Sequence, residues 1–215
     1  MTGLIGVRYF EDDRSARGTS LLTGVIPGMS ETFDSVNPRF NLAIRPFEDG
    51  MLFVDITKGF RSGTIQTPGQ ALLPSLVGID TGIVIDPDEL WTYELGAKWS
   101  LADGAFIVDA AVYFTDWSDI QIPFDAVGTG LVSVMNGGDA EITGLDLGIV
   151  WLTPIEGLSF QATANFNDTE IVKSDAALAA TLPTLAEGSM IPGVPETSYF
   201  LAGDYRRPLG STGSV

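Results

Sequence analysis

The stretch Leu90–Leu101 reads Leu-Trp-Thr-Tyr-Glu-Leu-Gly-Ala-Lys-Trp-Ser-Leu and alternates strictly between apolar and polar residues. Side chains leave a β-strand on its two faces in turn, so this alternation predicts a strand with one apolar and one polar face. The strand is long, because strands of soluble domains most often have about five or six residues. A face of this length belongs either to a large soluble core or to a membrane wall.

Two tryptophans on the apolar face favour the membrane wall. Trp91 and Trp99 lie near the two ends of the stretch, roughly 26 Å apart at about 3.3 Å per residue. At a tilt of about 45° the separation projects to roughly 19 Å, which is comparable with the apolar band and aromatic girdles of an outer-membrane barrel. This one segment is also compatible with a long strand whose apolar face lies in a soluble core.

The composition excludes several classes of function. The 215 residues carry a net charge of −17 and contain neither cysteine nor histidine. An acidic chain lacks the basic stripe that contacts phosphates, so no nucleic-acid partner is expected. Without histidine, the commonest general base and the commonest metal ligand are both missing. We therefore predict that the chain is not an enzyme and has no cofactor and no metal site.

Seven further segments repeat an alternating pattern and are predicted strands: 2–10, 38–45, 51–60, 105–115, 132–152, 158–167 and 197–205. Gly137 and Gly138 or Gly144 shift the phase within 132–152, which indicates a bulge. Short turns are predicted at 46–50, 102–104 and 153–157, and long loops at 11–32, 62–89, 117–130 and 168–195. The part of the last loop from 174 to 185 is rich in Ala and Leu and could form a short helix limited by Pro183.

Short and long connections alternate along the chain, and this is typical of outer-membrane barrels. The predicted fold class is all-β, an antiparallel transmembrane β-barrel segment of about eight long strands with short periplasmic turns and long extracellular loops. The side chains predicted to face the membrane are Trp91, Tyr93, Leu95, Ala97, Trp99, Phe106, Val108, Val112, Leu145, Leu147, Ile149, Trp151, Phe160 and Phe166. Those predicted to face the lumen are Arg39, Arg45, Asp55, Glu94, Lys98, Asp109, Gln161 and Asn165.

Three motifs resemble strands of TonB-dependent receptors. Asp86–Trp99 resembles their "PE-x-x-x-x-YE-x-G-x-K" strand, with Asp88 as an additional residue. Gly59–Gly63 resembles the "GFRSGG" that ends an earlier strand, with Thr64 in place of the second glycine of the pair. Val134–Leu147 resembles their "NAG-x-A-x-x-x-G-x-E" strand. Gly6–Tyr9 and Asp116–Gln121 also resemble segments of this family, and the five segments together, by their order and spacing, cover most of residues 1–207.

The resemblance implies energy-coupled import of a scarce nutrient, such as a ferric siderophore, cobalamin or a carbohydrate, across the bacterial outer membrane. It also implies a barrel of 22 strands, lipid around it, a plug domain inside it and a TonB energy-coupling partner. The sequence contains no plug, TonB box, signal peptide or terminal aromatic strand. We therefore expect residues 1–215 to be a partial barrel.

Individual polar residues are assigned structural roles. The acids Asp86, Asp88, Asp116, Asp119, Asp139 and Glu141 fall in loops or at strand ends and are expected to be solvated. The cations Arg39, Arg45, Arg61 and Lys98 are expected to pair with Asp55, Glu94 and Asp109 on neighbouring strands. Ligand-contacting residues cannot be assigned from loop composition.

Two alternatives to a partial receptor barrel remain. The first is a complete small outer-membrane barrel of about eight strands that serves as an adhesin or anchor. The second is a secreted soluble β-sandwich that binds a ligand. In either kind of barrel, lipid covers the apolar face of the sheet, whereas in a sandwich a second layer of protein covers it.

Overall fold

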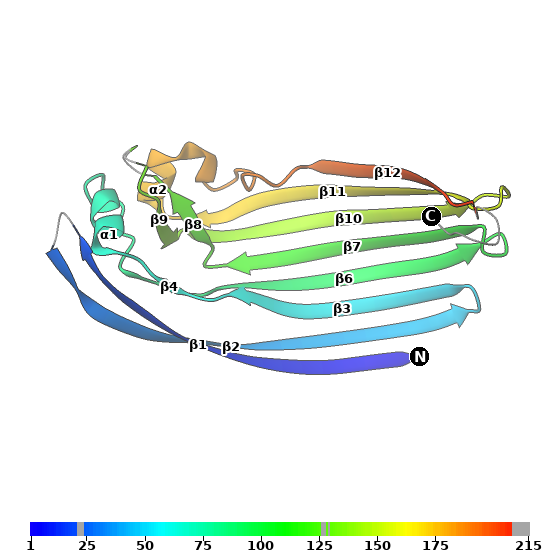
Figure 1. The fold of residues 1–215 in the computed structure, drawn as a ribbon, viewed down its shortest axis with the longest axis horizontal. Helices are drawn as coiled ribbons and strands as arrows, with labels where there is room; N and C mark the ends of the chain where they lie inside the picture. The colour runs from blue at the N-terminus through cyan, green and yellow to red at the C-terminus, as the bar shows by residue number, and fades with distance from the viewer. Residues whose placement is uncertain (21–23, 126–127, 129, 208–215) are drawn as a thin grey trace.

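Eight long strands lie side by side in one curved antiparallel sheet, in a computed structural model that describes residues 1–20, 24–125, 128 and 130–207 (Figure 1). Their order in space follows their order in the chain, β1-β2-β3-β6-β7-β10-β11-β12. The predicted antiparallel all-β fold of eight strands is confirmed. The bounds are β1 Thr2–Ser20, β2 Gly24–Phe47, β3 Gly50–Arg61, β6 Asp88–Leu101, β7 Phe106–Ser118, β10 Gly138–Leu152, β11 Leu158–Ser174 and β12 Thr197–Tyr205.

Backbone pairing holds the strands in one continuous register. Leu95 of β6 lies opposite Val54 of β3 and Val112 of β7, and the same row continues through Leu145 and Phe166. Directly opposed residues point to the same face of a sheet, so the apolar side chains of neighbouring strands form one surface. The alternation read from Leu90–Leu101 therefore extends across the whole sheet.

Three short turns join strands at one end of the sheet, as predicted. The turn from β6 to β7 places Ala102, Asp103 and Gly104 at φ 53°, 54° and 89°, in the left-handed region that glycine and aspartate adopt most easily. In the turn from β10 to β11, Gly157 has φ 81°, and a Cβ there would collide with the carbonyl oxygen of Arg206. These positions explain why short Gly-containing turns suffice at this end.

The opposite end carries the long connections, which contain short elements of their own (Figure 1). The β3–β6 connection holds a capped helix, because Thr67 and Gln70 form a reciprocal capping box at its N-terminus. The predicted helix within 174–185 is confirmed as α2 followed by the 3-10 helix η1. The elements are β4 Thr64–Ile65, α1 Pro68–Ser75, β5 Val84–Ile85, β8 Gln121–Phe124, β9 Ser133–Asn136, α2 Ala176–Thr181 and η1 Pro183–Leu185.

The loop predicted over residues 11–32 is wrong wherever the structure describes it. β1 and β2 continue through this region as a long hairpin, with Phe10 opposite Ser35 and Ser20 opposite Gly24, and residues 21–23 lie outside the description. Backbone pairing needs no apolar face, and local polar contacts reinforce it: the Thr32 hydroxyl donates to Asp13 at 2.7 Å. The charged and glycine-containing composition of 11–32, which is typical of loops, therefore led to a wrong prediction.

The predicted single segment 132–152 is also wrong, although its irregularity was placed correctly. The chain divides at Gly137 into β9, which pairs with β8, and β10, which belongs to the large sheet. A further register shift lies between Asp139 and Ala140. A Cβ on Gly138 would overlap the carbonyl oxygen of Lys173, so glycine is required for the close approach of β11.

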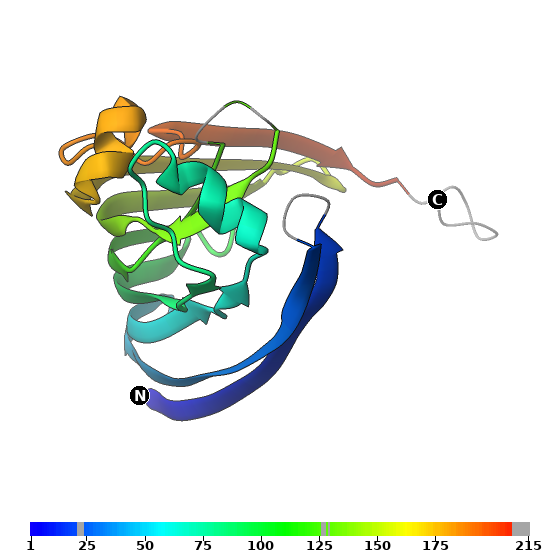
Figure 2. The same cartoon turned by 90° about the vertical axis from the view of Figure 1, so that its left-hand side faces the viewer.

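The sheet curls around one of its faces, and α1 and the β8–β9 segment lie inside this curve at the end that carries the long connections (Figure 2). Trp117, on the polar side of β7, lines a pocket with the connection residues Ile120 and Ile122, so the polar face is the concave one. Within the described residues, no helix is long and apolar enough to span a membrane.

Candidate functional site

The convex face is apolar and uncovered. All fourteen side chains predicted to face the membrane lie on this face according to the strand register. Leu95 keeps 57% of its surface exposed and Val112 keeps 51%, although both lie in the interior of the sheet. Within the described residues no second sheet packs on this side. A face of this size left in contact with solvent indicates an apolar partner rather than water.

A single row of residues ends this apolar face toward the long connections. Lys58, Trp91, Asp116, Glu141 and Glu170 lie opposite one another on five successive strands. Lys58 forms an ion pair with Glu89, one row further out, at 2.6 Å. Four of these five side chains are charged, so the apolar face gives way to charged side chains near this level on the five central strands.

Aromatic rings gather at both limits of the apolar face. Near the charged row, Tyr93 stacks between Trp91 at 6.5 Å and Phe114 at 6.4 Å, measured between ring centroids. Near the short turns, Trp151 stacks between Phe106 at 5.9 Å and Phe160 at 5.8 Å. Such pairs stabilise cross-strand contacts, and amphipathic rings suit the boundary between lipid and water.

The concave face carries the residues predicted to face the lumen. Arg39 donates to Asp55 Oδ2 from Nε at 3.1 Å and from Nη2 at 2.9 Å, and Asn41 donates to the same oxygen at 2.9 Å. These side chains line a polar cavity of about 650 Å³ together with Arg45, Glu94 and Lys98. The predicted pairing of Arg39 with Asp55 is confirmed, whereas the ammonium group of Lys98 lies 5.9 Å from the Phe53 ring centroid.

A second polar network on this face extends beyond the predicted lumen residues. The Tyr113 hydroxyl donates to Asn167 and accepts from Asn165 Nδ2 at 3.0 Å. Asn165 also donates to Asp146 at 2.6 Å. Gly144 makes room for this network, because a Cβ there would overlap the Tyr113 ring. The alternation of β7 places Tyr113 on the polar side, and this signal could have identified it.

Two of the family-like motifs, Gly59–Gly63 and Asp86–Trp99, meet at Asp88, where the concave wall joins the long connections. Asp88 is only 1% exposed; its Oδ2 accepts from Arg61 Nε at 3.0 Å, from Arg61 Nη2, and from the backbone N–H of Gln121 at 3.1 Å. Two predictions are thus wrong: Asp88 is not a solvated acid, and Arg61 pairs with this first residue of β6 rather than with Asp55, Glu94 or Asp109. A carboxylate buried this deeply needs a charge partner, and Arg61 is the cation within reach.

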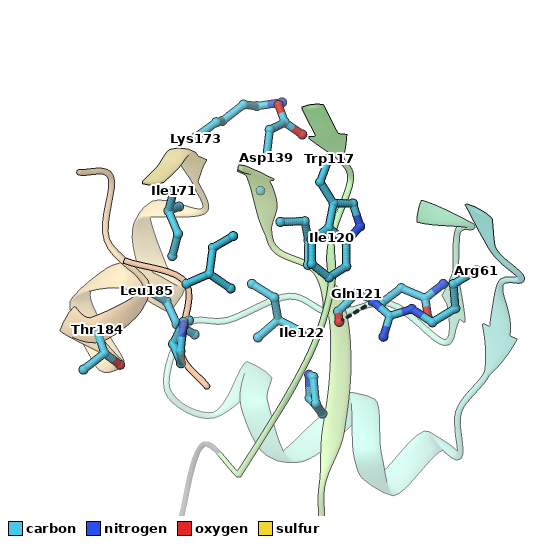
Figure 3. A pocket seen from close by; sticks show the side chains of 14 residues that line it. Arg61, Trp117, Ile120, Gln121, Ile122, Asp139, Ile171, Lys173, Thr184 and Leu185 are labelled. Atoms are coloured by element: carbon cyan, nitrogen blue, oxygen red, sulfur yellow. Dashed lines mark hydrogen bonds and ion pairs between the residues drawn. The ribbon is translucent and has the colours of Figure 1, made fainter. Parts of the chain in front are cut away.

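The long connections pack together into a small unit, which we call the outer cap and define as the described residues of 62–87, 119–137 and 175–196. Its buried apolar core consists of Ile79, Phe124, Met135, Ile171, Leu178 and Leu185, where Ile171 comes from β11. A pocket of about 440 Å³ lies between the cap and the wall, and Arg61, Trp117, Gln121 and Ile122 are among its lining residues (Figure 3).

Local charges also tie the β1–β2 hairpin to the cap. Asp12 accepts from Arg14 Nε at 2.7 Å and from the Ser62 hydroxyl at 3.0 Å. The hydrogen bond from Arg14, reinforced by the one from Ser62, lowers the pKa of the Asp12 carboxyl below its ordinary value. This contact lies beyond the charged row, outside the apolar part of the sheet.

Known proteins share both the sequence pattern and the fold. A curated relative, the probable TonB-dependent siderophore receptor PiuA of Acinetobacter baumannii, is 24% identical over 126 residues, which cover 57% of this chain and 16% of the relative. The solved structure of the ferric yersiniabactin uptake receptor FyuA from Yersinia pestis has a TM-score of 0.69 at 18% identity, over 94% of this chain and 28% of that receptor. The solved structure of PiuA from A. baumannii has a TM-score of 0.64 at 19% identity, with the same coverages.

The solved receptors show the fold: the curved sheet corresponds to part of a larger barrel, and this chain spans 28% of the length of each. The family described as "TonB dependent receptor-like, beta-barrel" matches residues 1–214. The match covers nearly the whole chain and includes all three motifs. The chain therefore belongs to the family of TonB-dependent receptor-like β-barrels.

Proposed function

We propose that this chain forms part of the wall of a bacterial outer-membrane receptor that imports a scarce nutrient with energy supplied through TonB. The uncovered apolar face that ends at one charged row carries this proposal. From Tyr93 to Leu101 the face extends about 26 Å along β6 at about 3.3 Å per residue. At a strand tilt of about 45° this length projects to roughly 19 Å, which is comparable with the apolar band of an outer-membrane barrel.

The orientation of the wall follows from its two ends. In outer-membrane barrels the short turns are periplasmic and the longer loops are extracellular. The turns after β2, β6 and β10 would then face the periplasm, and the outer cap would face the outside. The fourteen residues of the apolar face would contact lipid, and the polar cavity around Arg39 and Asp55 would line the lumen.

The lumen is the place for a plug domain and for the path of the solute. Arg45 and Lys98 line the polar cavity without an ion pair within the described residues, so they are available to acidic groups of a plug. We infer that the plug and the TonB box belong to the same receptor, because the relatives are named as TonB-dependent receptors. The partial barrel at 1–215 is therefore one section of the transport protein.

A ferric siderophore is the substrate class that the names of the relatives favour. The curated relative is named as a siderophore receptor, and the solved relatives include a ferric yersiniabactin receptor and a ferric citrate transporter. Cobalamin and carbohydrates are the other classes carried by receptors of this kind. The charges of the cap pocket do not favour one of these three substrate classes, because Arg61 and Lys173 are both paired with carboxylates.

Uptake by intact cells tests this function. The complete open reading frame that carries this chain is expressed in cells lacking their own siderophore, cobalamin and maltodextrin receptors. Radiolabelled ferric trihydroxamate, ferric tricatecholate, cobalamin and a maltose oligosaccharide are supplied in turn. We expect saturable accumulation of one ferric siderophore, and loss of that accumulation in an otherwise identical strain without TonB.

Three outcomes would contradict the proposal in different ways. Insertion into the outer membrane without TonB-dependent uptake of any probe would favour an adhesin or anchor. Recovery of a soluble monomer without detergent would favour a secreted binding protein and exclude a membrane wall. Accumulation of cobalamin or the oligosaccharide alone would keep the receptor function and replace the substrate class.

A further inference from the structure

The three long connections behave as one packed unit in the structure rather than as three independent loops. Ile79 comes from the first connection, Phe124 and Met135 from the second, and Leu178 and Leu185 from the third; none is more than 9% exposed. Buried side chains from three segments stabilise one another only when all three are in place. The outer cap therefore has a small core of its own.

Polar contacts join the first two connections more closely. Gln66 donates to the Thr81 hydroxyl at 2.8 Å and accepts from the backbone N–H of Val134 at 3.1 Å. Gln70 Nε2 donates to the Val132 carbonyl at 2.7 Å, and the Ser133 hydroxyl donates to the Gln70 carbonyl at 2.6 Å. The two segments thus share hydrogen bonds at several separate points.

The cap is fastened to the wall through Asp88. Gln121, whose backbone N–H donates to Asp88, also donates from Nε2 to the carbonyls of Ser62 at 3.0 Å and Asp86 at 2.9 Å. Arg61 Nη2 also donates to the Gln121 carbonyl at 2.9 Å. One buried carboxylate therefore holds a guanidinium of β3 and the start of β8 in fixed positions.

The same residues shape the pocket between cap and wall. Arg61 and Gln121 both line it, and the Arg61 guanidinium lies 5.9 Å from the Trp117 ring centroid (Figure 3). Asp88 itself is not among the lining residues, so it acts on the pocket through its two partners. A change at Asp88 alters the pocket by moving its walls and leaves the lining side chains chemically intact.

We propose that Asp88 is a positioning residue that locks the outer cap to the wall as one rigid unit and thereby fixes the shape of the cap pocket for a solute. The role in solute binding rests on the proposed function, whereas the locking of the cap does not. The buried ion pair thus fastens the first and second connections to the wall at one point, and the third packs on them through the shared core. Loss of the ion pair is expected to release the first two connections together.

Hydrogen exchange on the complete receptor tests the lock. Asp88→Asn keeps the shape of the side chain and removes its charge, so Arg61 loses its partner. We expect the amides of 62–87 and 119–137 to exchange at least about tenfold faster as a group, while those of β7 and β10 keep their rates. Asp55→Asn is the matched control, because Asp55 is also paired with an arginine and is 8% exposed; it should leave exchange in the cap unchanged.

Faster exchange confined to the neighbours of residue 88, or an equal effect of Asp55→Asn on the cap, would overturn the lock. Gln121→Ala provides a milder test if Asp88→Asn does not assemble. It removes only the two side-chain bonds to the connection carbonyls. The same group of amides should exchange faster, and unchanged exchange would contradict the proposal.

Uptake kinetics with a ferric trihydroxamate and a ferric tricatecholate test the effect on the pocket. For a transported probe, Asp88→Asn should raise KM about tenfold and leave the maximal rate per receptor unchanged, because binding geometry is lost and energy coupling is not. Glu156→Gln, in a short turn at the opposite end, is the control. If exchange in the cap increases but KM stays unchanged, Asp88 does not position the pocket for the solute. If the wild-type receptor carries neither probe, the proposed substrate class is wrong. The hydrogen-exchange result still tests whether Asp88 holds the cap to the wall.

Discussion

Two aspartates of the sheet have almost no contact with solvent, and each has a guanidinium beside it. Asp55 pairs with Arg39 across adjacent strands, and Asp88 pairs with Arg61. The first pair could be predicted, because the alternation of both strands puts the two side chains on one face. The second could not, because Asp88 lies in a Pro- and Asp-rich stretch that resembles a loop and is buried by a distant segment containing Gln121.

Asp12 provides a test by pH at the residue scale. Its carboxyl should titrate below the ordinary aspartate pKa of about 3.9, because Arg14 and Ser62 stabilise the charged form. The contact with Ser62 is then complete above the ordinary pKa and is lost as the pH falls through the lowered one. The carboxyl carbon shift in an NMR titration measures this value. Arg14→Gln should move it back toward the ordinary range, and an unchanged midpoint in that variant would argue against the assigned cause.

At the scale of the element, β6 shows what a strand pattern can and cannot establish. Its bounds, Asp88–Leu101, extend the predicted segment by only two residues, and its apolar row continues into both neighbours. Alternation predicts a strand well where one face must be apolar. It fails for the outer parts of β1 and β2, since no apolar face alternates there and the strands are held by backbone pairing and by polar contacts such as that of Thr32 with Asp13.

Leu95 gives a direct test of the environment of β6. Leu95→Arg should destabilise the receptor by about 2–4 kcal/mol in lipid if the residue lies near the bilayer midplane. Glu94→Gln, one residue earlier and on the concave face, should cost far less. Equilibrium unfolding of the complete receptor from phospholipid vesicles measures both. Equal costs for the two variants, or tolerance of Leu95→Arg in a detergent-free monomer, would rule out lipid contact.

At the scale of the whole molecule, the sheet and the cap differ in how far the sequence predicts them. The number of long strands, their antiparallel pairing and, from β2 onward, the alternation of short and long connections follow from local patterns and are confirmed. The cap depends on a core shared by segments far apart in the chain, to which both Ile79 and Leu178 belong. No local period records such contacts, so α1 and the shared core were not predicted.

The shared core makes the cap sensitive to a single deletion. Leu178 is fully buried, and Leu178→Ala should weaken the cap by about 2–5 kcal/mol while the wall strands keep their stability. Amide exchange should increase in 62–87 and 119–137 as well as around α2. Leu76→Ala, at a site that is 69% exposed, is the control and should have little effect. An increase limited to 175–196 would show that the third connection packs independently.

The interlocking of the three connections also restricts how such a receptor can change over evolutionary time. Exposed loops normally vary separately, because each is attached to the scaffold only at its ends. Here a new third connection would have to fill the space of Leu178 and Leu185 beside Ile79. Insertions fit best beside Gly193, because the space around it is open; the glycine itself has to stay, since its φ is 82°. Recombination that exchanges all three connections together would keep the cap intact, whereas exchange of one alone would leave a cavity.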